Sequence, residues 1–285
     1  MLSLQTNVAS LSTQNSLGAT QKALSTSMAR LGSGYRVNSA MDDAAGLQIA
    51  TRLNAQSRGM AVAQRNTQNG ISMLQTAEGA FGEVTDILTR MKDLATEAAN
   101  GTSTASDQTA MQSEFDALGQ ELSNIMNNTS FGGAKLLKGG TLAGSITFQI
   151  GASSAETMTA NLTADMTTLD TDLGAASANF TAAGTGTELT AAGGANATIG
   201  KINTALDSVG KVRSSLGAYA NRLDHVYNNL ANIRTNTDAA KGRIMDVDYA
   251  SETANMTAKQ MLMQASTSML KQSNSMSQMV MSLMQ

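Results

Sequence analysis

The fold is decided by residues 199–233, which read IGKINTALDSVGKVRSSLGAYANRLDHVYNNLANI. Apolar side chains recur there in steps that alternate three and four, so they form one seam along a helix. The seam residues are Ile202, Ala205, Val209, Val212, Leu216, Tyr219, Leu223, Val226, Leu230 and Ile233. The stretch therefore predicts a long helix, from about residue 199 to 237, that packs against other helices.

Two earlier segments repeat the same spacing. One carries Leu74, Ala77, Phe81, Val84, Leu88, Met91, Ala95 and Ala98, and the other carries Met111, Phe115, Leu118, Leu122 and Ile125. Three such seams predict a bundle of long helices. We expect Leu88, Met91, Leu216, Leu223 and Leu230 to form the seam of this bundle.

Both ends of the chain carry amphipathic stripes. The first segment has Leu4, Val8 and Leu11 at helical spacing and ends at the pair of glycines in 32–34, which suit a helix C-cap. The last segment, 251–284, has Leu262, Met269, Met276 and Leu283 each seven residues apart. These side chains are predicted polymerisation contacts, because an apolar stripe at a chain end is more often a partner-binding surface than a stripe without a function. Simple pairing of the two terminal helices within one chain is the alternative.

Composition limits the class of protein. Apolar residues make up 41% of the chain but aromatic residues only 3%, which fills a seam between helices and not a thick globular core. The absence of Cys excludes disulfides and thiolate metal sites, and a net charge of −3 argues against nucleic-acid binding. The first ten residues lack the features of a secretory signal peptide, and no stretch has the length of a membrane span. A cytoplasmic protein and one exported without a cleavable signal both fit.

The middle of the chain differs from its ends. The glycine-flanked segment 131–151 predicts one or two β-hairpins. Residues 152–199 are rich in Ala, Thr and Gly, and indicate either a small, weakly packed β-rich domain or a surface excursion. Helix starts are expected at a capping box formed by Ser39 and Asp42, and at Ser106 or Asp107.

The expected architecture is mainly α: an elongated helical bundle and coiled coil formed by the N- and C-terminal segments together, with a small insert rich in β-hairpins. Residues 1–42 and 246–285 would pair as a domain of terminal helices. Residues 43–145 and 199–245 would form the bundle with its hairpin, and 146–198 a short variable insert.

No catalytic or cofactor-binding set is expected. The single histidine, His225, lies beside the seam residue Val226 and is best interpreted as a surface side chain of a helix. The pair Asp42 and Asp43 suits a helix N-terminus better than a metal site. The glycine-rich tracts lack the Lys–Ser/Thr pair of a phosphate-binding loop.

Four blocks of sequence resemble bacterial flagellin. They are LGSGYRVNSAMDDAAGLQIA (31–50), RNTQNGISMLQTAEGA (65–80), RSSLGAYANRLDHVYNNLANI (213–233) and RIMDVDYASETANMTAKQMLMQAS (243–266). The resemblance covers roughly 1–145 and 199–285, and indicates a short member with a minimal central region. The chain differs from the common family pattern at Ser277, where the family commonly has Pro, and at Gln285, where a basic residue is common.

The resemblance implies a structural subunit, not an enzyme, that self-assembles into the helical, extracellular flagellar filament. It also implies unfolded export by the flagellar type III apparatus, and an export chaperone, filament cap and hook-junction proteins as partners. The segment TRMKDLATEAAN (89–100) resembles the stretch that the vertebrate Toll-like flagellin receptor binds. Arg90, Leu94 and Glu114 match the family positions implicated in that contact, with Leu94 expected at the flank of the seam.

Two other functions fit less well. A hook–filament junction protein shares the terminal helices of flagellin, but the blocks DDAAGL and RSSLGAYANRL favour the filament subunit. A secreted adhesin would act through the Thr-rich middle, where Phe180 is the one aromatic residue of 152–199.

Overall fold

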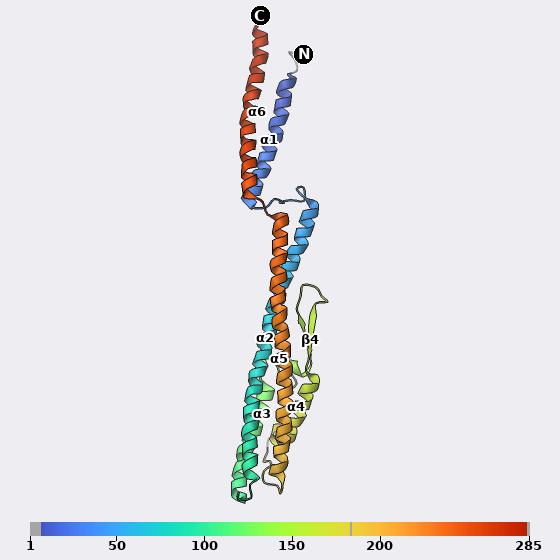
Figure 1. Cartoon of the computed structure of the whole chain (residues 1–285), viewed down its shortest axis with the longest axis vertical. Helices are drawn as coiled ribbons and strands as arrows, with labels where there is room; N and C mark the ends of the chain where they lie inside the picture. Colours follow the sequence, from blue (N-terminus) through green and yellow to red (C-terminus); the bar gives the residue numbers. More distant parts are fainter. Residues whose placement is uncertain (1–6, 183, 284–285) are drawn as a thin grey trace. The chain divides into compact units, whose positions relative to one another are not determined.

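The computed structural model describes residues 7–182 and 184–283, with side chains up to Met276. Long helices dominate it: α1 Val8–Ser33, α2 Ala44–Ala98, α3 Ala105–Asn128, α4 Thr163–Ala176, α5 Gly194–Met245 and α6 Tyr249–Leu283 (Figure 1). Four short strands lie between α3 and α4: β1 Ser130–Phe131, β2 Ala134–Lys135, β3 Ser145–Gln149 and β4 Thr157–Asn161. The mainly α class with a hairpin-bearing centre is as predicted.

The chain forms two compact units. One consists of Met1–Ser57 with Thr235–Gln285, and the other of Arg58–Arg234. The division falls inside α2 and α5, so each of these helices contributes to both units. The domain boundaries that the sequence places at 42, 145, 199 and 246 stay predictions.

The unit Arg58–Arg234 has one main core, built from the seams of α2, α3 and α5. Every residue of the α2 seam from Leu74 to Ala98 is at most 2% exposed, and Phe115 and Leu122 of α3 are fully buried. Leu88, Met91, Leu216 and Leu223 lie in this core. Leu230 packs in a smaller cluster with Met60 and Ala63. Alternating three- and four-residue steps keep one face of each helix toward the others.

Two antiparallel hairpins extend this core. Phe131 pairs with Ala134 across a turn in which Gly132 and Gly133 have φ of 59° and 86°. Positive φ at both central residues of a two-residue hairpin turn requires glycine in practice. In the second hairpin β3 pairs with β4, and β4 alternates buried Met158 and Ala160 with exposed neighbours. Its inner face therefore belongs to the core.

The prediction for 152–199 was wrong. Helix α4 lies there and buries Met166, Leu169, Leu173 and Ala176 in the main core. These residues follow the same three- and four-residue steps as the other seams. The many Thr and Ala residues between them make the apolar periodicity of α4 hard to recognise in the sequence.

A buried polar network attaches the segment after α4 to α3. Asp116 accepts hydrogen bonds from the side chains of Gln112 and Asn179, each at 2.7 Å, and from the backbone N–H of Gly186 at 3.1 Å. Gln112 also donates to Glu188 at 2.9 Å. Buried polar groups need such partners, so the network fixes the path of a segment that has few large apolar residues.

Three predicted helix ends differ from the structure. Thr104, and not Ser106 or Asp107, is the N-cap of α3, with Asp107 completing the capping box. Helix α2 begins after Asp43, whose carboxylate accepts from the N–H of Gly46, so Ser39 and Asp42 form a turn ahead of the helix. Helix α5 continues past Thr237 to Met245, because 238–245 contain no Pro and the single glycine there, Gly242, costs only about 1 kcal/mol relative to Ala.

Replacing Leu223 by Ala should lower the free energy of unfolding by about 2–5 kcal/mol, because the side chain is fully buried and its removal leaves a cavity. Urea unfolding followed by circular dichroism measures this change. Leu262→Ala is the matched control, since Leu262 is 57% exposed and its truncation should cost much less. Equal losses in the two variants would contradict the assigned core.

Candidate self-association surface on the terminal helices

Helices α1 and α6 pack together within the unit Met1–Ser57 and Thr235–Gln285. Their buried and half-buried positions follow heptad spacing on both helices. We call these positions the terminal seam: Ser10, Thr13, Leu17, Thr20, Leu24, Ser27 and Leu31 on α1, and Glu252, Met256, Lys259, Met263, Ser266, Leu270 and Ser273 on α6. More than half of these side chains are polar, so this seam buries less apolar surface than the bundle seams do.

Polar contacts along the terminal seam show that the two helices are antiparallel. The ammonium of Lys259 donates to the hydroxyl of Ser27 at 2.8 Å. Toward the other end of the pair, the side chain of Asn7 donates to the carbonyl of Ser273 at 3.1 Å. Hydrogen bonds of this kind fix the register of two helices but add only about 0.5–1.5 kcal/mol each.

A backbone bridge joins the two chain segments at the start of α6. The N–H of Arg36 donates to the carbonyl of Met245 at 2.6 Å, and the N–H of Val247 donates to the carbonyl of Gly34 at 3.0 Å. Gly34 has φ of 77°, and a Cβ there would lie 2.9 Å from the hydroxyl of Tyr249. Glycine is therefore needed both for the C-cap of α1 and for this close approach.

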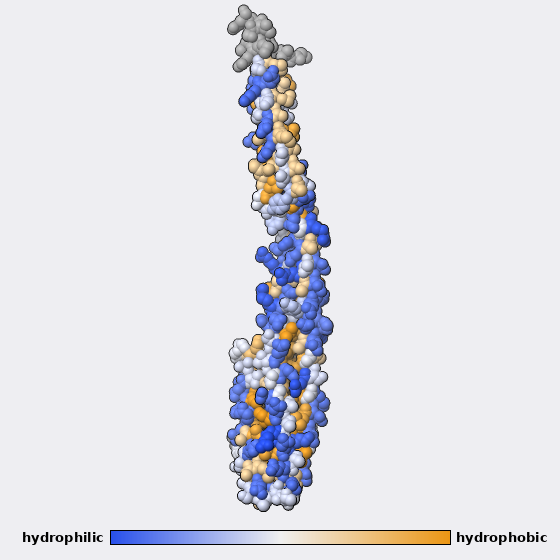
Figure 2. Space-filling model, turned by 60° about the vertical axis from the view of Figure 1, so that its left-hand side comes forward, coloured by the Kyte–Doolittle hydropathy of each residue, from blue (hydrophilic) through white to orange (hydrophobic). Residues whose placement is uncertain are grey.

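Large apolar side chains lie exposed outside the terminal seam. They are Val8, Leu11 and Met28 on α1 and Met261, Leu262, Met269 and Met276 on α6, and we call them the exposed terminal set. Leu262 and Met269 each come one residue before a seam position, so they flank the seam. Figure 2 shows apolar residues gathered along the helices that lie next to the grey terminal atoms.

The predicted polymerisation residues fall into two groups. Val8, Leu11, Leu262, Met269 and Met276 belong to the exposed terminal set, each about half exposed or more. Leu4 and Gln285 lie outside the described residues, as do the side chains of Ser277 and Leu283. Sequence reasoning missed Met28 and Met261 as exposed groups, because helical spacing alone does not say which face the partner helix covers.

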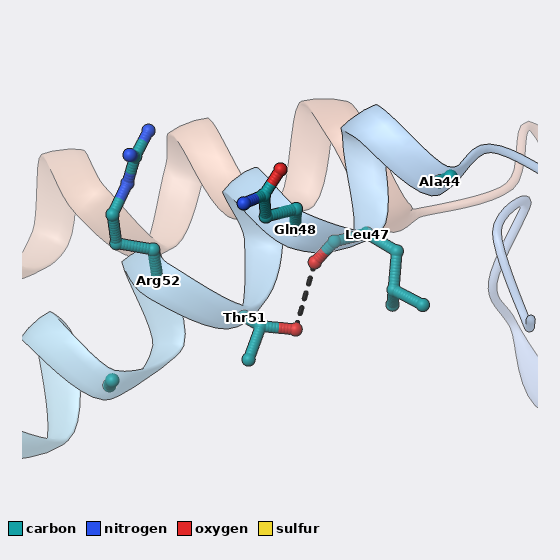
Figure 3. Close-up of a pocket in the computed structure, with 6 residues that line it drawn as sticks. Ala44, Leu47, Gln48, Thr51 and Arg52 are labelled. Atoms are coloured by element: carbon teal, nitrogen blue, oxygen red, sulfur yellow. Dashed lines mark hydrogen bonds between the residues drawn. The ribbon is translucent and has the colours of Figure 1, made fainter. Parts of the chain in front are cut away.

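A shallow hollow lies at the beginning of α2. It is lined by Ala44, Leu47, Gln48, Thr51, Arg52 and Ala55 (Figure 3). The hydroxyl of Thr51 donates to the carbonyl of Leu47 at 2.8 Å and is thus engaged with its own helix. The lining offers neither a nucleophile with a base beside it nor a set of metal ligands.

The remaining candidate groups are His225, Asp42 and Asp43. His225 is exposed on α5, and the carboxylates of Asp42 and Asp43 accept from backbone N–H groups. Among the described residues, no three His, Cys, Asp or Glu side chains are grouped to hold a metal ion. None of the helices searched, which cover those same residues, is long and apolar enough to cross a membrane.

Arg90 and Glu114 form an ion pair between α2 and α3. The guanidinium nitrogens lie 2.7 and 2.8 Å from the carboxylate of Glu114, and both side chains are about half exposed. Leu94, one residue before the seam residue Ala95, is only 2% exposed, so this flank of the seam is buried. Helix α2 packs against neighbours over a wider stripe than the seam alone, and Leu94, one turn from Met91, falls inside it.

Helices from both ends of the chain, paired through a half-polar seam with apolar side chains left exposed, are typical of a helical structural subunit. Models of the bacterial flagellin N-terminal helical region and the bacterial flagellin C-terminal helical region match residues 4–141 and 199–284. The chain belongs to the bacterial flagellin family. Members of this family are structural proteins that polymerise into the extracellular flagellar filament.

Individual relatives agree with this assignment. The chain is 38% identical to Flagellin A of Vibrio anguillarum and 37% identical to Flagellin A of Vibrio cholerae, and both alignments cover each chain completely. A solved structure of a putative flagellar hook-associated protein from Vibrio parahaemolyticus is 17% identical, with a TM-score of 0.54 over 72% of this chain and 100% of that one. That likeness concerns the fold alone.

Helix α6 begins at a cap that lowers a pKa. Asp248 accepts from the hydroxyl of Ser251 at 2.7 Å and from the N–H of Ala250 at 3.0 Å. The Ser251 hydroxyl is the main cause that holds the pKa of Asp248 below its ordinary value of 3.8. A lowered pKa means that the cap stabilises α6 above pH 3.8 and that this contribution is lost as the pH falls through the lowered pKa.

Ser251→Ala should therefore raise the pKa of Asp248 toward 3.8 and move the loss of this cap to higher pH. Carboxyl titration by NMR measures the shift. Asp107, whose pKa is lowered chiefly by Thr104, is an internal control that should not change in this variant. An unchanged titration of Asp248 would contradict the assigned cap.

Proposed function

We propose that the exposed terminal set is the surface through which this chain self-assembles into a helical flagellar filament used for swimming. The observation that supports this most is that α6 has two sets of positions, one covered by α1 and one exposed. Seam positions pack against α1, whereas Leu262 and Met269, one residue before a seam position each, leave most of their surface to solvent. Exposed apolar side chains placed in a regular row are typical of an interface that another protein covers.

The energetics favour partners over solvent. A large apolar side chain gains on the order of 1.5–3 kcal/mol when it moves from full exposure to full burial. The residues of the exposed terminal set already stand on formed helices, so burying them does not carry the full backbone ordering cost of about 1–2 kcal/mol per residue. Contacts shared among many copies make the assembly cooperative and dependent on concentration.

The proposal includes the route by which the chain reaches the filament. The chain would be exported unfolded through the flagellar type III apparatus, and would meet an export chaperone, the filament cap and the hook-junction proteins. The chain has no Cys and no Pro, so neither disulfide formation nor proline isomerisation slows folding after export. The apolar face of α6 is the proposed contact for the chaperone before assembly.

A hook–filament junction protein is the competing function within the same fold. The likeness to a putative hook-associated protein does not separate the two, because at 17% identity it concerns the fold alone. Identity of 37–38% to flagellins along the complete chain favours the filament subunit. A junction protein is not expected to form long filaments alone, which electron microscopy of the purified chain tests directly.

Leu262→Gln should raise the critical concentration for polymerisation by about tenfold or more, because it places an amide where the interface needs an apolar group. Sedimentation of polymer and negative-stain microscopy measure this. The monomer should keep its circular dichroism spectrum, since Leu262 is exposed in the free chain. Thr257→Gln, which changes an exposed polar residue of the same helix, is the control. Normal filaments from Leu262→Gln would refute the proposed surface.

We also propose recognition by the vertebrate Toll-like flagellin receptor through Arg90 and Glu114. The exposed ion pair presents a cation and an anion side by side on α2 and α3, which gives a receptor two oriented polar groups. Leu94 supports this face from within the core and does not offer its side chain to a partner. Its proposed role in the contact is therefore to position the helix surface.

Arg90→Asp should reduce receptor activation by the monomer strongly, because it removes the cation and sets a second carboxylate against Glu114. A reporter assay in receptor-bearing cells measures the response. Arg65→Asp, the same change at another exposed position of α2, should leave the response near that of the unmodified chain. Equal activity of the Arg90 and Arg65 variants would exclude this recognition site.

A further inference from the structure

The described methionines range from buried to exposed, with Met73, Met111, Met245, Met256 and Met263 in between. Met60, Met91, Met126, Met158 and Met166 are at most 3% exposed and lie in the cores of the unit Arg58–Arg234. In contrast, Met261, Met269 and Met276 of α6 are 60%, 66% and 49% exposed. The chain has no Cys, so thioethers are its only sulfur groups.

Exposure decides which thioethers an oxidant reaches. A methionine sulfur attacks one oxygen of hydrogen peroxide, an S–O bond forms while the O–O bond breaks, and the departing hydroxide is released as water after proton transfer. The sulfur loses two electrons and the peroxide gains them. The product, methionine sulfoxide, is polar where the thioether was apolar. Buried thioethers of the bundle are shielded from the same reagent.

We propose that Met261, Met269 and Met276 form a reversible oxidation switch on self-assembly, in which a peroxide is the substrate that modifies the free chain. This inference rests on the proposed role of α6 in polymerisation. Sulfoxides at these positions bring a strong acceptor into an interface that must exclude water, and burial of such a group without a partner is unfavourable. Methionine sulfoxide reductases return the side chain to the thioether and so restore assembly.

The placement of these residues confines the effect to assembly. None of the three is a terminal-seam position, so their oxidation leaves the contacts of α6 with α1 in place. The buried methionines of the main core, Met91, Met126, Met158 and Met166, are at most 3% exposed. The reagent does not reach them, so the core keeps its packing. The oxidised chain is therefore a folded monomer that polymerises only at a higher concentration. In the filament the same thioethers are covered, so polymer formed first resists the reagent.

The test treats the full-length monomer with dilute hydrogen peroxide, removes the reagent, and maps sulfoxides by mass spectrometry. We expect sulfoxide at Met261, Met269 and Met276 and not at the five buried methionines. The critical concentration for polymerisation should rise by about tenfold for each sulfoxide that must be buried. The helical content should stay unchanged, and a sulfoxide reductase with dithiothreitol should reverse the effect. Sulfoxide at these sites with an unchanged critical concentration would overturn the proposal.

Variants assign the effect to particular sulfur atoms. For each variant the measured quantity is the ratio of critical concentrations after and before peroxide. Replacement of Met28, Met261, Met269 and Met276 together by Leu should lower this ratio toward one, because these exposed positions of α1 and α6 then have no sulfur to oxidise. Met41→Leu is the matched control: Met41 is 93% exposed but lies between α1 and α2, so the ratio should equal that of the unmodified chain. A full peroxide effect in this fourfold variant would refute the assignment.

The Leu262→Gln variant separates the two proposals. If it polymerises normally, the proposed surface on α6 is wrong, whatever peroxide does. If it fails to polymerise while the peroxide-treated chain, carrying the mapped sulfoxides, assembles normally, only the oxidation switch is wrong. Both proposals stand when each change raises the critical concentration.

Discussion

The half-polar seam between α1 and α6 is the constraint on which the rest of the terminal unit depends. Hydrogen bonds such as that from Lys259 to Ser27 fix the register of the two helices. However, these polar groups occupy seam positions at which apolar side chains would hold the pair more strongly. Two helices that meet on a narrow seam cover only one side of each other. Apolar side chains such as Leu262 and Met269 are consequently left in solvent within a single chain.

The unit Arg58–Arg234 uses the opposite design. Its α2 seam from Leu74 to Ala98 and its α5 seam around Leu216 and Leu223 are apolar at nearly every position and almost completely buried. Such a core buries its apolar side chains within one chain and does not require a second copy to cover them. The Arg90–Glu114 ion pair stands on the surface of this unit, between two helices whose packing holds both groups in place. One chain thus contains a core that is buried within the chain and a pair of helices whose apolar side chains stay partly exposed.

Much of the fold follows from the sequence. The seams of α2, α3 and α5 are visible as alternating steps of three and four, and the glycine at 34 marks the end of α1. The hairpin turn at Gly132 and Gly133 is equally visible, because glycine at both central positions indicates this turn. Local rules were less reliable at helix starts. Thr104, Ser106 and Asp107 are all good capping residues, and in the structure Thr104 is the N-cap because it forms a reciprocal capping box with Asp107.

The central segment and the site mark the limit of sequence reasoning. Helix α4 has the right spacing, but its small residues conceal the pattern, and the network of Asp116 with Gln112 and Asn179 joins residues up to 63 positions apart. The sequence by itself determined which segments are helical and which faces are apolar, because helix periodicity is a local property. Only the tertiary structure decided which apolar residues are covered. It buried Leu94 and exposed Leu262, since coverage depends on the neighbouring helix and not on spacing along the chain.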